Sequence, residues 1–383
     1  MMRRVFCRYA SYIVGALVLA CCSNPNSAKL TRSGLNPEKF IDVKDGSATA
    51  LFKLTNANGV EVCITNYGGR IVSLMVPDRE GALRDIVLGF DSIQAYYPEN
   101  NKTDFGAAIG RYANRINRGR FLLDGDSVRL SVNNGLHCLH GGETGWQYRV
   151  YDVISATDST LVLMINSFDG DNGFPGNVKA SVQYLLTADN KLNVRYWAET
   201  DKPTVINLTN HSYFNLGGDL TASVANQELM INADGFTPID STFMTTGEIA
   251  PVRDTPFDFT TAKPIGRDLA CADEQIANGK GYDHNFVLNT RGDLTIPAIE
   301  AFSPQTGIKM TIFTSEPGVQ LYSANFLDGS VVGKHNCAYP QHSAFILETQ
   351  HYPDSPNKPQ WPSVVLRPGE TYTSNTIFAF AAE

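Results

Sequence analysis

Closely spaced cysteine pairs, which are typical of zinc sites, are missing from the sequence after residue 22. After the first 22 residues the cysteines stand far apart, at Cys63, Cys138, Cys271 and Cys337. A disulfide in an oxidising compartment stays open, but no pairing can be assigned from these positions. We expect the four thiols to be small buried apolar groups.

The sequence also lacks a comfortable membrane span near its N-terminus, because the apolar run there covers only residues 12–20. Three arginines precede this run, at Arg3, Arg4 and Arg8. A basic start, a short apolar core and small residues before a cut are typical of a secretory signal. Residues 1–20 are therefore predicted to be a signal peptide that is removed.

The end of this run, Val18-Leu19-Ala20-Cys21, resembles a bacterial lipobox. Cys21 would then take lipid on its sulfur and hold the protein at a membrane without spanning it. Ordinary cleavage after Ala20, with an unmodified thiol, is the alternative. Residues 21–35 are predicted to be a flexible tether. We expect an exported periplasmic or cell-envelope lipoprotein of a bacterium.

Positive charge is scarce as well. The formal net charge is −8, and removal of residues 1–20, which hold three arginines and no acid, lowers it to −11. An acidic surface disfavours electrostatic binding to nucleic acid or to an anionic bilayer. The substrate is therefore expected to be neutral or cationic.

Interior linkers, low-complexity segments and strong helical periodicity are absent, and the only short helical candidates are 92–97 and 265–270. Short β-rich runs recur between turn residues instead. Within 192–198, for example, Leu, Val and Tyr alternate with Asn, Arg and Trp. The pattern predicts one large antiparallel β-sandwich domain over residues 36–383. Predicted strands include 60–66, 71–76, 127–130, 160–167, 179–187 and 191–198.

Five segments interrupt this pattern with dense polar or aromatic residues, at 109–116, 139–142, 207–216, 281–286 and 345–350. Glu348 is the most informative of these residues, because the apolar run before it should be a buried strand. A buried carboxylate without a partner is costly, so Glu348 needs either a partner or a chemical purpose. From the residues alone, a structural ion pair and an acid/base role both stay open.

His211 and His140 leave the same choice open. His211 lies in a strand-like polar segment, where a histidine is more often a hydrogen-bonded core residue than a catalyst. His140 precedes Gly141 and Gly142, which allow close backbone approach and would leave the imidazole at the edge of a loop. His137 and His140 have a spacing that could bind a metal, but further ligands are missing, so no metal site is expected.

All five segments, in this order, resemble those of the galactose mutarotase (aldose 1-epimerase) family. Two more segments do so, GFPGN at 173–177 and PGVQLYSANFLDG at 317–329. The similarity runs from about residue 56 to the C-terminus. The chain departs from the family at Trp146-Gln147, where a phenylalanine and an acid are frequent, and at Tyr151, where a tryptophan is frequent. These departures concern specificity or packing more than proton transfer.

The resemblance implies a galactose mutarotase-like supersandwich, and an isomerase that interconverts the α and β anomers of free aldohexoses such as galactose and glucose. It implies Glu348 as the base that takes the anomeric proton and His211 as the acid that protonates the ring oxygen, with His140 beside that oxygen. Because each group regains its starting state on ring closure, no cofactor is expected. The resemblance also implies sugar-positioning roles for Asn114, Arg115, Asp283 and Gln320.

Several alternatives stay open at this point. Arg115 could pair with Asp283 in a structural network instead of binding sugar. Tyr213 or Trp146 could stack on a sugar face or belong to the core. A non-catalytic carbohydrate-binding module and a glycoside hydrolase, which needs paired carboxylates, are the rival functions, and the two family histidines disfavour both. The protein is expected to work as a monomer or homodimer.

Overall fold

The computed structural model describes residues 30–383, so the predicted signal peptide and Cys21 lie outside the described residues. Antiparallel strands dominate the described chain, with one short α-helix, α1 (Glu274–Gly279). The all-β prediction is confirmed, and the six predicted strands agree with the observed ones to within two residues at each end. Within residues 30–383, no helix combines the length and the apolar character needed to cross a bilayer.

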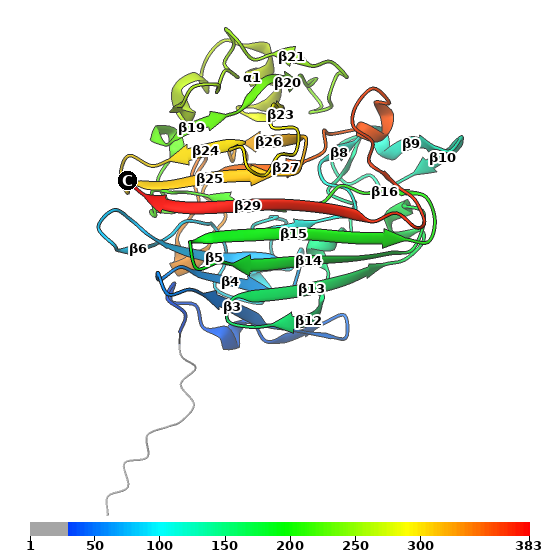
Figure 1. Ribbon diagram of the computed structural model, residues 1–383. Helices are drawn as coiled ribbons and strands as arrows, with labels where there is room; N and C mark the ends of the chain where they lie inside the picture. The colour runs from blue at the N-terminus through cyan, green and yellow to red at the C-terminus, as the bar shows by residue number, and fades with distance from the viewer. Residues whose placement is uncertain (1–29) are drawn as a thin grey trace, which may run out of the picture.

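The largest sheet has nine antiparallel strands and runs across the whole molecule (Figure 1). Burial alternates along its central strands, as the period of two in the sequence predicts: Val178, Ala180 and Val182 are buried, and the residues between them are more exposed. In spatial order the strands are β12 (Asp152–Ala156), β13 (Thr160–Ser167), β14 (Val178–Leu186), β15 (Lys191–Thr200), β29 (Tyr372–Ala382), β25 (Ile308–Thr314), β24 (Ile299–Phe302), β19 (Glu228–Ile231) and β22 (Lys263–Pro264).

Two smaller sheets share one apolar core with the large sheet, which makes the molecule a sandwich. The six-stranded sheet has the order β18 (Tyr213–Phe214), β27 (Phe345–Gln350), β26 (Gly318–Tyr322), β23 (Asp283–Leu288), β20 (Ala233–Thr237) and β21 (Ala250–Pro251). The four-stranded sheet has the order β3 (Leu51–Thr55), β4 (Glu61–Thr65), β5 (Arg70–Pro77) and β6 (Leu83–Asp85).

Short strand pairs complete the described chain. They are β1 (Asp42–Lys44) with β2 (Ser47–Thr49), β7 (Ala107–Ile109) with β17 (Thr209–His211), β8 (Arg115–Ile116) with β11 (Cys138–Leu139), β9 (Arg120–Leu123) with β10 (Asp126–Arg129), and β16 (Thr204–Val205) with β28 (Val365–Leu366). Isolated 3-10 turns are η1 (Pro37–Phe40), η2 (Ile93–Tyr96), η3 (Asn117–Gly119), η4 (Trp146–Tyr148), η5 (Asp171–Gly173), η6 (Val224–Asn226), η7 (Ile265–Asp268), η8 (Lys334–Asn336) and η9 (Ser355–Asn357).

Strands β26 and β27 position a polar row, because both are buried along their whole length. Val319, Leu321 and Leu347 belong to the shared apolar core. Since side chains alternate between the two faces of a sheet, Gln320 and Glu348 lie on the face turned away from that core. The two residues are direct partners across the strands. Their burial therefore comes from the loops and strand pairs that cover this second face.

The predicted tether over 21–35 needs a correction at its end. Thr31, Ser33 and Leu35 are buried, and the Ser33 hydroxyl donates to the Ser73 hydroxyl at 2.9 Å. The backbone N–H of Arg32 also donates to a carboxylate of β4 at 2.6 Å. The segment from 31 to 35 therefore packs on the sandwich, because an apolar side chain and local hydrogen bonds anchor it.

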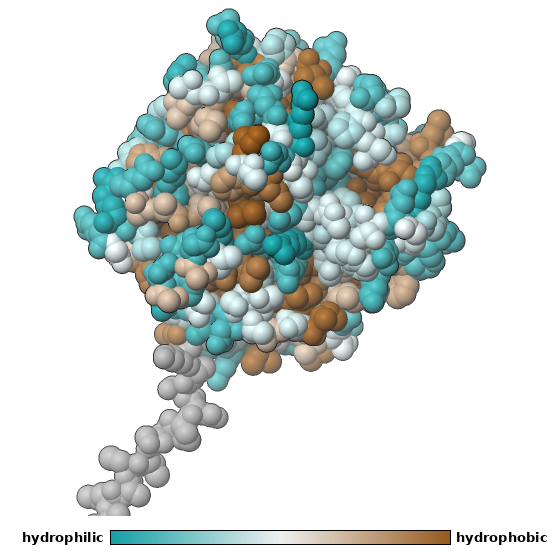
Figure 2. Space-filling model, in the orientation of Figure 1, coloured by the Kyte–Doolittle hydropathy of each residue, from teal (hydrophilic) through white to brown (hydrophobic). Residues whose placement is uncertain are grey.

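The helix and cysteine predictions also differ from the structure in part. The two helical candidates form the 3-10 turns η2 and η7, and α1, the one α-helix between residues 30 and 383, was not predicted. Asp273 caps α1 by accepting from the backbone N–H groups of its first turn. Cys63 and Cys138 are buried as expected, whereas Cys271 is exposed and Cys337 partly exposed, and all four are free thiols. On the face shown in Figure 2, apolar residues form separate spots among hydrophilic ones.

Candidate active site

His140 lies in a tight turn after β11. His140, Gly141 and Gly142 all have positive φ angles, of 50°, 83° and 94°, and a Cβ on Gly141 would overlap with the carbonyl oxygen of Gly110. This close approach lets the backbone N–H of Asn114 donate to His140 Nδ1 at 3.1 Å. Burial holds the pKa of His140 well below its usual value. The neutral ring therefore carries its proton on Nε2.

His211 ends β17, which pairs with β7. The adjoining residues hold this strand end: Asn210 Nδ2 donates to the Gly106 carbonyl at 3.0 Å, and the Ser212 hydroxyl donates to Asn210 at 2.6 Å. Burial lowers the pKa of His211 to about 4, so its imidazole is neutral at pH 7. The rings of His140 and His211 meet edge to face, with their centroids 5.1 Å apart.

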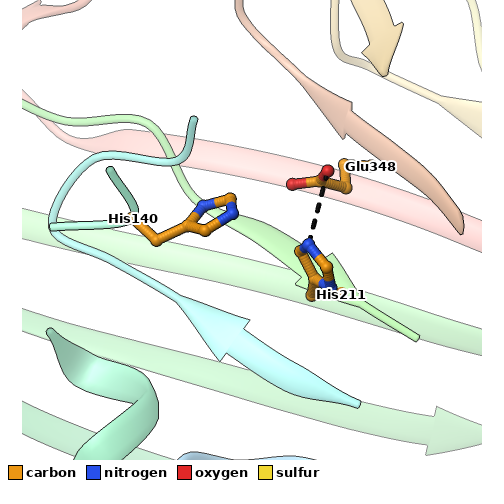
Figure 3. A group of neighbouring side chains, drawn as sticks. All are labelled: His140, His211 and Glu348. Atoms are coloured by element: carbon orange, nitrogen blue, oxygen red, sulfur yellow. Dashed lines mark ion pairs between the residues drawn. The ribbon is translucent and has the colours of Figure 1, made fainter. Parts of the chain in front are cut away.

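Glu348 points from β27 towards the two histidines (Figure 3). Its Oε1 lies 3.5 Å from His211 Nε2, and its Oε2 has no hydrogen-bond partner among the described residues. Only 2% of Glu348 is exposed. Burial raises the pKa of Glu348 well above its usual value; the charge of Asp283 adds to this effect, and that of Arg115 opposes it. A structural ion pair with lysine or arginine therefore does not account for this carboxyl group.

The three side chains lie on the wall of one cavity of about 310 Å³, called the site cavity below. One donor atom of each of His140, His211 and Glu348 lies within 4.8 Å of the other two. A volume near 300 Å³ is at the small end of ligand pockets in proteins. The lining residues are Lys102, Thr103, Asp104, Asn114, Arg115, Asn134, Leu139, His140, His211, Tyr213, Asp283, Tyr322, Phe326, Leu327, Val331 and Glu348.

The residues predicted to position sugar fall into two groups. Asn114, Arg115 and Asp283 line the site cavity, whereas Gln320 does not. Gln320 Nε2 instead donates to Asp283 Oδ1 at 2.7 Å, so it holds that carboxylate in place. Arg115 Nη1 lies 3.9 Å from Asp283 Oδ2, which is too long for a strong hydrogen bond. Arg115 and Asp283 therefore lie within ion-pair distance of each other and also line the site cavity.

The nitrogens and carboxylate oxygens of His140, His211 and Glu348 suit proton transfer better than metal binding. Two imidazoles and a carboxylate at this spacing could surround a metal ion. However, His140 Nδ1 already accepts a hydrogen bond, so its Nε2 bears the proton and has no free lone pair to offer. His137, the other candidate ligand, has both nitrogens engaged, with a backbone N–H at 3.1 Å and a threonine hydroxyl at 3.0 Å.

Some residues that line the site cavity were not predicted from the sequence. Tyr322 lies two residues after Gln320 on β26, so the strand period would have placed it on the same face. Asp104 and Asn134 stand in loops, which carry no periodic signal. Of the two aromatic candidates for stacking, Tyr213 lines the cavity, and Trp146 is a core residue that does not.

A family model, similar sequences and a similar solved structure all point to the same kind of protein. The family model described as aldose 1-epimerase matches residues 50–379. Aldose 1-epimerase from Escherichia coli (strain K12) is 38% identical over 341 residues, which covers 88% of this chain and 97% of that protein. Galactose mutarotase from Sus scrofa is 39% identical over 346 residues, with 89% and 97% covered. The crystal structure of an aldose epimerase homologue from C. elegans superposes with a TM-score of 0.80 at 32% identity, covering 88% of this chain and 99% of that one.

Proposed function

From the premise that this chain belongs to the aldose 1-epimerase family and is an isomerase of free aldoses, we propose that Glu348 and His211 are its base and acid. The observation that carries this proposal is the buried approach of His211 Nε2 to Glu348 Oε1, at 3.5 Å, on the wall of the site cavity. The two groups are close, yet too far apart for a strong mutual hydrogen bond. Both therefore stay available to a substrate.

The reaction moves two protons and needs no second substrate. In the form that reacts, the proton of the Glu348–His211 pair lies on His211 and the carboxylate is ionised. Glu348 then takes the proton of the anomeric hydroxyl while His211 gives its proton to the ring oxygen, so the bond between C1 and the ring oxygen breaks. The open-chain aldehyde rotates about its C1–C2 bond, and closure on the other face returns both protons. The anomeric and ring oxygens share C1, so an acid and a base only a few ångströms apart can reach both.

The burial of both groups supports this reversible exchange. Burial raises the pKa of Glu348 and lowers the pKa of His211 to about 4. On an exposed surface the histidine would hold the proton in preference to the carboxylate. Burial reverses this preference, so one proton can lie on either group, on His211 before ring opening and on Glu348 before ring closure.

His140 is proposed to support the ring oxygen. Its Nδ1 accepts from the Asn114 backbone, so its Nε2–H can donate into the cavity beside His211. A fixed donor next to the oxygen that changes charge stabilises the transition state. Asn114, Arg115 and Asp283 are proposed to hold the sugar hydroxyls, with Gln320 supporting Asp283.

Polarimetry on freshly dissolved α-galactose and α-glucose tests the proposal. We expect the wild-type protein to accelerate the drift to anomeric equilibrium, and the variants Glu348→Gln and His211→Asn to lose about 10²- to 10⁴-fold in kcat. Activity retained by either variant would refute its assigned role. No acceleration by the wild type over buffer would refute the function itself.

A matched control is available in the same sandwich. Glu316 and His351 form a second histidine–carboxylate pair, at 2.8 Å, and Glu316 is only 2% exposed. Neither residue lines the site cavity. The variant Glu316→Gln should therefore keep kcat within about threefold of the wild type, even if its thermal stability falls. A loss of activity as large as that of Glu348→Gln would show that the polarimetric effect is not specific to the cavity.

The rival functions gain no support. The similar proteins are named as an epimerase and a mutarotase, and the similarity spans almost their full length. A carbohydrate-binding module would bind the sugars without accelerating the drift, and a glycoside hydrolase would release a new product from a glycoside. Galactose and glucose are proposed as substrates because the relatives include galactose mutarotase, and the same assay compares them.

The cellular location is proposed from the sequence alone. Residues 1–20 have the features of a secretory signal, and Cys21 follows Ala20 as in a lipobox. We propose export and lipid attachment at Cys21. Mass spectrometry of the mature N-terminus should find a diacylated Cys21; an unmodified Cys21 thiol after cleavage, or an uncleaved Met1, would contradict lipidation.

A further inference from the structure

A second cavity adjoins the site cavity next to His140. It has a volume of about 230 Å³ and is called the side chamber. The two cavities share wall residues, among them Asp104, Asn134 and His140. Gln147 and Tyr148 form part of the side chamber's own wall. A sugar in the site cavity would therefore present one edge of its ring to this chamber.

Three polar oxygens at these walls have no hydrogen-bond partner among the described residues. They are Thr103 Oγ1, Asp104 Oδ1 and Gln147 Oε1. Thr103 lines the site cavity, Gln147 the side chamber, and Asp104 both. Gln147 is 1% exposed, so bulk water does not satisfy it. Buried polar atoms without partners are rare in folded proteins, and here they point to a ligand that donates hydrogen bonds.

Arg70 links the two walls through hydrogen bonds to their backbone. Burial raises the pKa of Asp104, and the charge of Arg70 and a hydrogen bond with the Tyr148 side chain offset only part of this shift. Its Nη1 donates to the backbone carbonyls of Thr103 at 3.2 Å and Phe105 at 3.0 Å, and its Nη2 donates to the Gln147 carbonyl at 2.9 Å. Arg70 is fully buried. Because these hydrogen bonds go to backbone oxygens, the carboxylate of Asp104 is left without a donor from this guanidinium.

The chemistry of the ligand follows from the acceptors. A carboxylate accepts only, a threonine hydroxyl can accept, and a glutamine amide can present its oxygen. A sugar hydroxyl offers one donor, whereas an ammonium group offers three donors and a compensating positive charge. The lining of the site cavity holds three carboxyl groups, Asp104, Asp283 and Glu348, against two cations, Lys102 and Arg115. This excess of acidic groups and the net charge of −8 favour a cation over an anion.

Resting on the proposed function, we infer that Asp104, together with Thr103 and Gln147, binds an ammonium substituent of the sugar, so that free amino aldoses are substrates of this enzyme. The amino group would occupy the part of the site cavity that borders the side chamber. Asp104 is thus a substrate-binding residue that sets specificity, and the proton transfers at Glu348 and His211 stay as described.

The test compares glucose with two free amino aldoses, 2-amino-2-deoxyglucose and 6-amino-6-deoxyglucose, at a pH at which the amines are protonated. Anomer interconversion is followed by polarimetry. We expect the wild-type kcat/KM for at least one amino aldose to equal or exceed that for glucose. The variant Asp104→Asn should lower kcat/KM for that amino aldose by roughly tenfold or more, mainly through KM, and that for glucose by less than about threefold.

Glu143→Gln serves as the control. Glu143 borders the side chamber, but 62% of its side chain is exposed and it pairs with Lys102 in solvent at 3.5 Å. This variant should leave kcat/KM unchanged for glucose and for the amino aldoses. If the wild type accelerates anomer interconversion of glucose but of neither amino aldose, the inference is overturned and the proposed function still stands. Equal losses for both kinds of sugar in Asp104→Asn also overturn it. The wild-type ratio needs no variant and stands even if Asp104→Asn folds poorly.

Discussion

Replacement of Glu348 by glutamine should make the protein less active and, at neutral pH, more stable. The carboxyl group is 2% exposed, and within residues 30–383 its Oε2 has no hydrogen-bond partner. The one side chain of that range within ion-pair distance of it is a histidine that is neutral at pH 7. A buried ionised group without a counter-ion costs folding free energy. Glutamine keeps the shape of the side chain and removes the charge.

The size of the effect follows from this burial. An unpaired buried polar group costs about 1–3 kcal/mol, and an unpaired buried charge costs at least as much, so removal of the charge should raise the free energy of unfolding by about 1–3 kcal/mol. For a domain of roughly 350 residues this corresponds to a rise in Tm of about 1–4 °C. The loss of kcat, about 10²- to 10⁴-fold, is the catalytic counterpart.

The raised pKa of Glu348 predicts how the difference in stability between the two proteins changes with pH. The pKa of Glu348 is raised in the folded protein, so the unfolded chain loses this proton at lower pH. Below the unfolded pKa both states are protonated, and the wild type keeps its full stability. As pH rises through the folded pKa, the wild type loses stability, whereas Glu348→Gln does not. The difference in Tm should therefore be small at acidic pH and grow towards neutral pH.

Thermal unfolding of both proteins over this pH range, followed by circular dichroism, measures the difference. Glu316→Gln is again the matched control, because Glu316 has a histidine partner at 2.8 Å, and its loss should lower Tm. A Glu348→Gln variant that is less stable than the wild type at neutral pH would refute the reasoning. It would mean that Glu348 contributes a stabilising ion pair instead of an unpaired charge.

Three further predictions concern the same cavity. In Arg115→Gln, loss of the positive charge that lowers the pKa of Glu348 should move the acidic limb of the kcat/KM profile to higher pH; an unchanged limb would exclude this coupling. Gly141→Ala should lower kcat by about tenfold or more in polarimetry, because its Cβ overlaps with a backbone carbonyl and displaces His140, and wild-type kcat would contradict this account. Gln320→Leu should raise KM by roughly tenfold with kcat nearly unchanged, because the neighbouring aspartate loses a donor at 2.7 Å; a loss in kcat alone would argue against a positioning role.

The fold class could be read from the sequence because it depends on local rules. Alternating side chains, as in β15, and turn residues between short runs are enough to predict strands. The order of the strands in the sheets was not predictable, because the partners lie far apart along the chain. Strand β29, at the C-terminus, lies between β15 and β25. Residues 31–35 were predicted to be tether because nothing local shows that Leu35 packs on the sandwich.

The candidate site was predictable where a residue conflicted with its surroundings or matched a family segment. Glu348 conflicted with its apolar strand, and His140 and His211 lay in polar segments that resemble the family. Asp104 gave no such signal, because it stands in a loop where an exposed aspartate is ordinary. Only the structure shows that Arg70 and the walls around it place Asp104 beside the cavity.

The sequence by itself determined which reactive groups this protein has and that strands carry them, since both are properties of residues and their near neighbours. The tertiary structure alone decided that the groups meet: Glu348 and His211 are 137 positions apart in the chain, yet 3.5 Å separates Glu348 Oε1 from His211 Nε2. It also decided their protonation, because a pKa depends on burial and on charges brought near by folding. The same carboxylate and imidazole on an exposed surface would be an ordinary acid and an ordinary histidine.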